Sequence, residues 1–282
     1  RLHLPQPLIS SAIRYNRAEG LFLGGGASYG VKPWLGIAAH GGLSLGRERP
    51  ALSLTLHGGE RHPQTRLTAF WNRPVELGLE ASISGVLNSL STLILEEDYT
   101  DLVFATGARA ARRWKPTERV SLDILARMED HARPRNVIAS AESASDFRPI
   151  VPVEAGRWRS LQAQLTLPTP VPDLSLETRG LMGRFRNRDF GELTGSLRLH
   201  HRSLSRGLEL EGSLAAGTLL GTPPRQALYL LGGRETVPGH AFRSRVGDQY
   251  WLLKARVGYP LLPPYLGLRA FGAAGGTGYR GN

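Results

Sequence analysis

The stretch Arg119–Met128, RVSLDILARM, alternates apolar and polar side chains, and this period of two decides the fold class. Val120, Leu122 and Ile124 fall on one side of an extended chain, whereas Asp123 falls on the other. An α-helix would instead repeat its apolar positions every three to four residues. The alternation therefore predicts a β-strand with two chemically different faces.

The same alternation recurs along the chain, for example in RSLQAQLTL at 159–167 and GLELEGSL at 207–214. Many of these segments are about ten residues long, whereas strands of soluble proteins average ~5–6 residues and tilted membrane strands need ~9–11. Short polar turns such as VKPW and KPTE join most of them, which predicts an antiparallel up-and-down meander. We expect about thirteen strands, near residues 20–30, 35–45, 50–59, 65–72, 101–113, 118–130, 158–168, 173–185, 191–201, 207–218, 226–232, 248–259 and 265–275.

Alternation alone does not say which face of a strand is buried. A soluble sandwich buries its apolar face between two sheets, whereas a membrane barrel turns that face to lipid and encloses the polar one. Strand length and number favour the barrel, because closure removes the sheet edges. We therefore predict one domain, residues 1–282, that is all-β and forms a transmembrane antiparallel up-and-down β-barrel. A soluble β-rich binding protein stays as an alternative that solubility would decide.

Composition limits the partners of the chain. The 282 residues carry a net charge of +11 and contain no cysteine, which excludes disulfides and thiolate metal sites. Absence of thiols is compatible with an oxidising envelope compartment. The basic residues recur in separate short turns rather than in one patch with aromatic residues, so we expect no nucleic-acid partner.

Enzyme motifs are weak. The segment HGGERH at 57–62 lacks the helical spacing of a zinc metalloprotease, and His200 and His201 fall on opposite faces of a strand. The acidic run Glu96–Asp98 is interpreted as a helix end or a solvated turn. No nucleophile-elbow motif is present. We predict no enzyme activity, no catalytic or metal-binding residue and no small-molecule cofactor.

Two long connections interrupt the meander. Residues 72–101 show helical spacing of apolar positions at Val86, Leu90 and Leu93, with Ile94 next to them. They predict a short helix that packs on the sheet or plugs a lumen. Residues 131–156 are rich in proline, serine and alanine, which predicts an irregular loop.

A third long connection opens the stretch GGRETVPGHAFRSRVGDQYWLLKARVGYPL at 232–261. The strand that follows alternates Trp251 and Leu253 with Lys254 and Arg256, so one of its faces is polar. If the apolar face meets lipid, a glycine-bearing loop can fold back and fill the polar lumen. The residues that we expect to form this inward-folded loop are Gly232, Gly233, Val237, Gly239, Phe242, Arg243, Gly247 and Asp248.

This run resembles the penultimate conserved region of the BamA-type outer-membrane barrel superfamily, the bacterial surface antigen barrels. In that family the sixth extracellular loop carries a Val-Arg-Gly-Phe/Tyr motif and folds into the lumen. RYNRAEGLFLGGG at 14–26 resembles the first barrel strand of related branches, and LNSLSTLILEEDYTD at 87–101 resembles the segment after their fourth strand.

The resemblance implies a barrel of sixteen strands in the outer membrane of a Gram-negative-type bacterium. Its partners would be a lipid bilayer with lipopolysaccharide and other envelope proteins or subunits of a complex. Its function would be the insertion or translocation of polypeptides, at a weak seam between the first and last strands. The thirteen strands counted here predict either an incomplete chain or a smaller barrel. Because strands begin by about residue 20, we expect no periplasmic POTRA module before the first strand.

The sequence departs from the family motif at its ion pair. The family arginine aligns with Pro238, and its aspartate partner, within Phe271–Gly275, aligns with Ala273. Loss of both partners leaves no uncompensated buried charge, so the fold prediction stands. Arg243 is a possible substitute, without a partner that the sequence identifies. These departures favour an alternative function, a structural barrel anchor or subunit of a larger envelope complex without insertase activity.

The strand count also places the loops. It puts the glycine-bearing loop after the eleventh strand and the two other long connections after the fourth and sixth. An antiparallel meander then places this loop at one end of the barrel and both long connections at the other.

Overall fold

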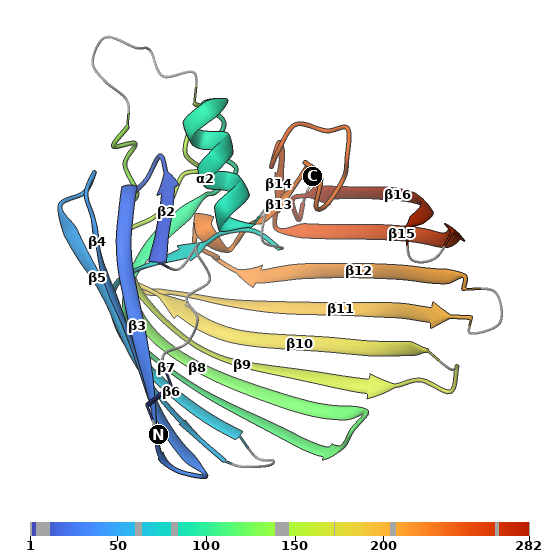
Figure 1. Cartoon of the computed structure of the whole chain (residues 1–282), viewed down its shortest axis with the longest axis horizontal. Coiled ribbons are helices and arrows are strands. Elements are labelled where there is room, and N and C mark those ends of the chain that lie inside the picture. Colours follow the sequence, from blue (N-terminus) through green and yellow to red (C-terminus); the bar gives the residue numbers. More distant parts are fainter. Residues whose placement is uncertain are drawn as a thin grey trace.

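The computed structural model describes residues 2–3, 12–59, 64–79, 84–138, 147–171, 173–203, 207–262 and 265–281. They form one curved, strongly twisted antiparallel sheet of fourteen strands (Figure 1). The prediction of an all-β up-and-down meander is confirmed, since the long strands follow one another in chain order. These are β3 (Gly20–Lys32), β4 (Leu35–Ser44), β5 (Arg49–Gly58), β6 (Gln64–Glu76), β7 (Leu102–Thr117), β8 (Val120–Ala132), β9 (Gly156–Pro168), β10 (Leu174–Phe185), β11 (Arg188–Arg202), β12 (Glu209–Gly221), β15 (Gln249–Leu262) and β16 (Leu266–Gly278).

The sheet is an open, barrel-like wall. Two short strands, β1 (Leu2–His3) and β2 (Ile13–Asn16), pair with β3, and β16 lies at the other end of the strand order. Within the described residues β16 and the β1–β3 group do not pair, so the predicted closed circle is not seen.

The strand predicted at 226–232 is present only as a three-residue strand outside the main sheet, and this changes the arrangement of the loops. A 3-10 turn, η1 (Arg225–Ala227), is followed by the three-residue strand β13 (Tyr229–Leu231). β13 pairs with β14 (Arg245–Gly247) in a separate two-stranded sheet. All three residues of β13 are buried, because this segment packs inside the molecule instead of presenting one face to each side.

Without that strand, all long connections lie at one end of the sheet. This loop end carries the β2–β3 turn and the connections 77–101, 133–155 and 222–248, whereas the connections at the opposite end, the turn end, are all short in sequence (Figure 1). The predicted separation of the glycine-bearing loop from the other two long connections is therefore a consequence of the miscounted strand.

The predicted helix is present as α2 (Gly85–Ile94), and the side chain of Ser84 caps it by accepting from Leu87 N at 3.3 Å. The helix packs on the sheet along β2, as one of the two predictions had it. It does not pack through its apolar positions, because Val86, Leu90, Leu93 and Ile94 are exposed. In the connection 133–155 the described residues are irregular, as predicted, and 139–146 lie outside them. No helix in the described part of the chain is long and apolar enough to cross a membrane.

The two faces of the sheet differ as the alternation predicts. On β8, Ile124 and Met128 are 40% and 58% exposed on the convex face, whereas Glu129 is buried on the other. Cross-strand register extends the apolar face around the wall. The other sheet in the described residues, β13–β14, lies against the polar face, where Tyr229 Oη donates to Glu192 Oε1 at 3.3 Å. The described residues therefore do not form the two stacked sheets around an apolar core that a soluble sandwich would have.

Candidate functional site at the inward-folded loop

The connection 222–248 folds back onto the polar face of the sheet. Lys254 Nζ on β15 donates to the Glu235 carbonyl at 3.3 Å. Leu231 and Val237 from the loop form a buried cluster with Leu252 of β15. The loop thus lies on the side of the wall where the sequence placed it, and we refer to residues 232–248 as the inward loop.

Glycines shape the inward loop at two positions where the backbone is left-handed. Gly232 has φ +117°, and a Cβ there would lie 2.2 Å from the Ala241 carbonyl oxygen. Gly233 has φ +92°, and its amide donates to His240 O at 3.0 Å. These turns bring the chain back on itself, so that Arg243 N donates to Gly232 O at 3.1 Å.

The other predicted residues lie at the tip and at the base of the inward loop. Gly239, at φ +87°, lies at the exposed tip, where an added Cβ would meet no atom within 4 Å. Gly247 pairs with Tyr229 and packs on Gly278, and Asp248 accepts from Arg280 N at 2.9 Å. Gly247 and Asp248 attach the base of the inward loop to the wall.

Gly232→Ala is expected to displace the inward loop, because left-handed strain of roughly 1–3 kcal/mol adds to a backbone clash. Gly239→Ala is the matched control, since it has the same kind of strain in open space. Limited proteolysis of the folded protein measures the effect. Equal cleavage rates in the two variants would show that the close approach at Gly232 does not hold the loop.

Arg243 is the point at which the inward loop binds the rest of the molecule. Its backbone is left-handed at φ +51°, and its side chain is buried. Nη1 donates to Asp101 Oδ2 at 2.9 Å, and Nη2 donates to Glu76 Oε1 at 3.1 Å. The partner that the sequence did not identify therefore lies in the β6–β7 connection, 142 positions earlier.

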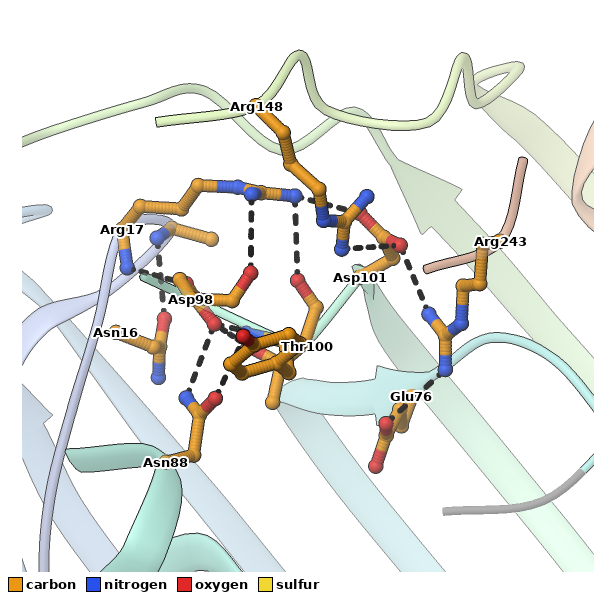
Figure 2. Close-up of polar contacts among 11 residues, drawn as sticks. Asn16, Arg17, Glu76, Asn88, Asp98, Thr100, Asp101, Arg148 and Arg243 are labelled. Atoms are coloured by element: carbon orange, nitrogen blue, oxygen red, sulfur yellow. Dashed lines mark hydrogen bonds and ion pairs between the residues drawn. The ribbon is translucent and has the colours of Figure 1, made fainter. Parts of the chain in front are cut away.

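Three arginines form ion pairs with the fully buried carboxylate of Asp101 (Figure 2). Arg17 Nη2 lies 2.6 Å from Oδ1, while Arg148 Nη2 and Arg243 Nη1 lie 2.7 and 2.9 Å from Oδ2. The four residues come from the β2–β3 turn and from the three long connections. We call these residues with Glu76 and Asp98 the Asp101 cluster, and it ties every long connection of the loop end together.

Asp98 completes the cluster and corrects the interpretation of the acidic run. Glu96 and Glu97 are exposed after the helix end, as expected, but Asp98 is buried rather than solvated. It accepts from Arg17 N at 2.7 Å and from Asn88 Nδ2 at 2.9 Å. With Glu76 and Asp101 it balances the three arginines, which satisfies the requirement that buried charges be paired.

Phe242 packs beside the cluster. Its ring meets Tyr99 edge to face at a centroid distance of 5.4 Å. The guanidinium groups of Arg148 and Arg243 lie 4.5 and 4.7 Å from the ring centroid. A ring face attracts a cation, so Phe242 holds both arginines in the orientation that reaches Asp101.

The Asp101 carboxyl has a pKa below its usual value of 3.8. Burial is the largest single influence and acts to raise this pKa, but Arg148, Arg243 and Arg17 together outweigh it. Because folding lowers this pKa, ionised Asp101 stabilises the loop end at any pH above 3.8. That stabilisation is lost as the pH falls through the lower value of the folded state.

Acid is therefore expected to release the inward loop before it unfolds the wall. Pepsin digestion along an acid titration should show cleavage within 232–248 that begins below the usual aspartate pKa. Asp101→Asn should be cleaved at every pH of the titration. Cleavage in the unaltered protein that is independent of pH would contradict the role of ionised Asp101.

The positions of the absent family ion pair lie close together in space. Pro238 of the inward loop and Ala273 of β16 line the same cavity of about 580 Å³, together with Lys254 and Arg256. The sequence alignment to the family motif is thus compatible with the geometry. Arg243 does not fill this cavity, since it binds Asp101 and Glu76 instead.

The structure also brings together three side chains that no sequence motif linked. Donor atoms of His200, Glu209 and Glu211 lie within 4.8 Å of one another on the polar face. Arg256 Nη1 binds Glu211 Oε2 at 2.9 Å. Residues 60–62 of the HGGERH segment lie outside the described residues. The absence of a metal site stays a prediction.

Comparison with known proteins supports the fold. No protein-family model and no curated protein matches the sequence. The structure is similar to that of BamA from Haemophilus ducreyi lacking POTRA domains 1–3, with a TM-score of 0.58 at 9% sequence identity. The match covers 94% of this chain and 57% of that chain, so the present chain spans somewhat more than half of it. The chain has the fold of a BamA-type barrel wall, which confirms at the level of fold the resemblance noted in the sequence.

Proposed function

We propose that the chain is a β-barrel of the BamA type that spans the outer membrane of a Gram-negative-type bacterium. The observation that carries this proposal is the opposition of the two faces of the wall. One face exposes large apolar side chains along its whole length, and the other holds the inward loop and the ion pairs. An exposed apolar surface of this extent has a favourable environment only in a bilayer.

Aromatic residues support the membrane placement. Trp71 and Trp251 lie near the loop end, Trp114 and Tyr259 lie near the turn end, and Trp34 lies in the β3–β4 turn, each about half exposed. On β15, Trp251 and Tyr259 are separated by roughly 26 Å of strand. Strand tilt shortens this height to roughly 20 Å, close to the ~25 Å apolar band of barrels with two aromatic girdles. The bilayer with its lipopolysaccharide is then the partner of the outer face.

The polar face supports an enclosed interior. Glu129 binds Arg109 on the neighbouring strand, and Arg179 Nη2 lies 2.7 Å from Glu192 Oε1. Arg127 Nη2 donates to Gln162 Oε1 at 2.7 Å. Such cross-strand pairs are suited to a lumen that polar groups and water share.

Extraction and gel migration test the barrel. We expect the protein to partition into detergent and to migrate faster before heating than after it, because folded barrels resist dodecyl sulfate. A monodisperse soluble protein in the absence of detergent would contradict the membrane placement.

For activity, we propose the insertion or translocation of polypeptides at the seam between the first and last strands. An unpaired strand edge offers backbone donors and acceptors that can pair with an incoming strand. Vesicles that contain the protein should accelerate the folding of an unfolded outer-membrane barrel relative to empty vesicles. No acceleration in vesicles that hold correctly folded protein would contradict this activity.

A structural anchor or subunit of a larger envelope complex is the second candidate. The observation in its favour is that the inward loop lacks the family ion pair at Pro238 and Ala273 and is bound at Arg243 instead. Replacing residues 234–246 by a short flexible linker separates the candidates. Loss of partner assembly with unchanged outer-membrane protein biogenesis supports the anchor, and impaired biogenesis supports the insertase.

A further inference from the structure

Helix α2 has the opposite amphipathicity to a helix of a soluble protein. Its polar residues Asn88 and Thr92 are 2% exposed, whereas Leu87, Leu90 and Ile94 are 58%, 49% and 72% exposed. An apolar stripe of a soluble helix normally faces the core. On α2 the stripe faces away from the protein.

Hydrogen bonds from the polar side fix this orientation. Asn88 Nδ2 donates to Asp98 Oδ1 at 2.9 Å, and Asn88 Oδ1 accepts from Tyr99 N at 2.8 Å. Ser89 Oγ accepts from Tyr15 N of β2 at 2.9 Å. Turning the apolar stripe inward would break all three hydrogen bonds. Asp98, a member of the Asp101 cluster, would then lose the side-chain amide of Asn88 as a donor. The outward stripe is therefore a consequence of buried polar contacts and not of a loosely attached helix.

The helix also continues the outer apolar face of the wall. α2 lies beside β2 (Figure 1), and the bond from Tyr15 N places it along the edge of β2 that does not pair with β3. Ile13 on β2 and its register partner Leu23 on β3 are exposed on the outer face. The apolar surface thus extends from the strands onto the helix, and the helix, Gly85–Ile94, contains no charged residue that would interrupt it.

We propose that acyl chains of the membrane around the barrel cover the apolar stripe of α2, so that the helix anchors the loop end in the membrane interface. This inference rests on the proposed function. The sequence marks the depth of the helix, because the exposed residues Glu96 and Glu97 follow its end and belong in the headgroup region. The rim of a protein–protein interface is normally polar and often charged, but helix α2 carries no charged residue, and a lipid environment needs none.

Single-cysteine labelling tests this proposal, since the natural chain contains no cysteine. An environment-sensitive fluorophore is attached to Leu90→Cys, to Leu54→Cys on the outer face of β5 and to Glu48→Cys in the exposed β4–β5 turn. The proteins are reconstituted in phosphatidylcholine vesicles with or without nitroxide-labelled acyl chains. We expect the Leu90→Cys label to be blue-shifted and quenched to at least about half the extent of the Leu54→Cys label, as for a helix in the interface. The Glu48→Cys label should not be quenched.

The controls separate the possible failures. If the Leu54→Cys label is quenched and the Leu90→Cys label is not, the barrel is in the membrane and the helix inference is wrong. A Leu90→Cys label that is blue-shifted but unquenched would also overturn it, since protein rather than lipid would then cover the stripe. If the Leu54→Cys label is not quenched either, the proposed membrane function itself fails.

Discussion

Asp101→Asn is expected to lower the free energy of unfolding of the loop end by about 3–5 kcal/mol, the cost of breaking a buried ion pair by removing one partner. The loss of one carboxylate charge leaves Arg17, Arg148 and Arg243 buried, with an excess of positive charge around them. Because three long connections meet there, the inward loop should be released together with the connection that carries Arg148. Heat-dependent gel migration gives the stability of the wall, and proteolysis within 232–248 gives the release of the loop.

Asp130→Asn is the matched control for this substitution. Asp130 pairs with Arg157 at 3.2 Å, but both side chains are more than half exposed. Exposed ion pairs contribute about 0–1 kcal/mol, so little change is expected. Equal effects of the two substitutions would show that burial of the Asp101 carboxylate gives it no special role at the loop end.

Ile124→Arg is expected to cost about 2–4 kcal/mol if the outer face of β8 meets the middle of a bilayer. The same substitution on the exposed face of a soluble sheet would change stability by about 0.5 kcal/mol or less. Ile124 is exposed in the isolated molecule, so contacts within the protein predict no such penalty. Unfolding in urea from lipid vesicles measures the difference.

Ser121→Arg on the same strand is the control for Ile124→Arg. Ser121 faces the polar side of the wall, opposite Thr166. An added arginine there enters the polar interior, where a small change is expected. If both variants lost a similar amount of unfolding free energy, the outer face would not lie in a more apolar environment than the inner face, and the membrane placement would be contradicted.

The strands were predictable because their signal is local. Alternation such as that of RVSLDILARM depends only on neighbouring residues, and the structure follows it from β3 to β16. The segment 226–232 was wrongly counted as a strand of the wall because ALYLLGG at 227–233 is apolar on both sides of the chain, which a buried loop segment shares with a strand. That one error reversed the end assigned to the inward loop. Which face meets solvent, and whether the wall closes, depend on surroundings that alternation does not encode.

The Asp101 cluster was only partly predictable. Arg243 was expected in the inward loop, together with Phe242 that packs beside the cluster, but Asp101, Arg17 and Arg148 come from other connections, and no local pattern links them. The helix shows the same limit. Its apolar spacing predicted a helix correctly, yet the side it presents to the protein is set by Asn88 and its bond to Asp98. Ion pairs and polar contacts between distant segments need the fold before they can be inferred.

The central claim is that the apolar side of these alternating strands meets lipid while the polar side encloses the inward loop. Nitroxide labels at single cysteines along positions 122–129 of β8, in the reconstituted protein, test it most directly. Collision with oxygen, which concentrates in the bilayer, should be high at Leu122, Ile124, Ala126 and Met128 and low at the positions between them. Oxygen accessibility without this alternation, or with its maxima at Asp123, Leu125 and Arg127, would contradict the account.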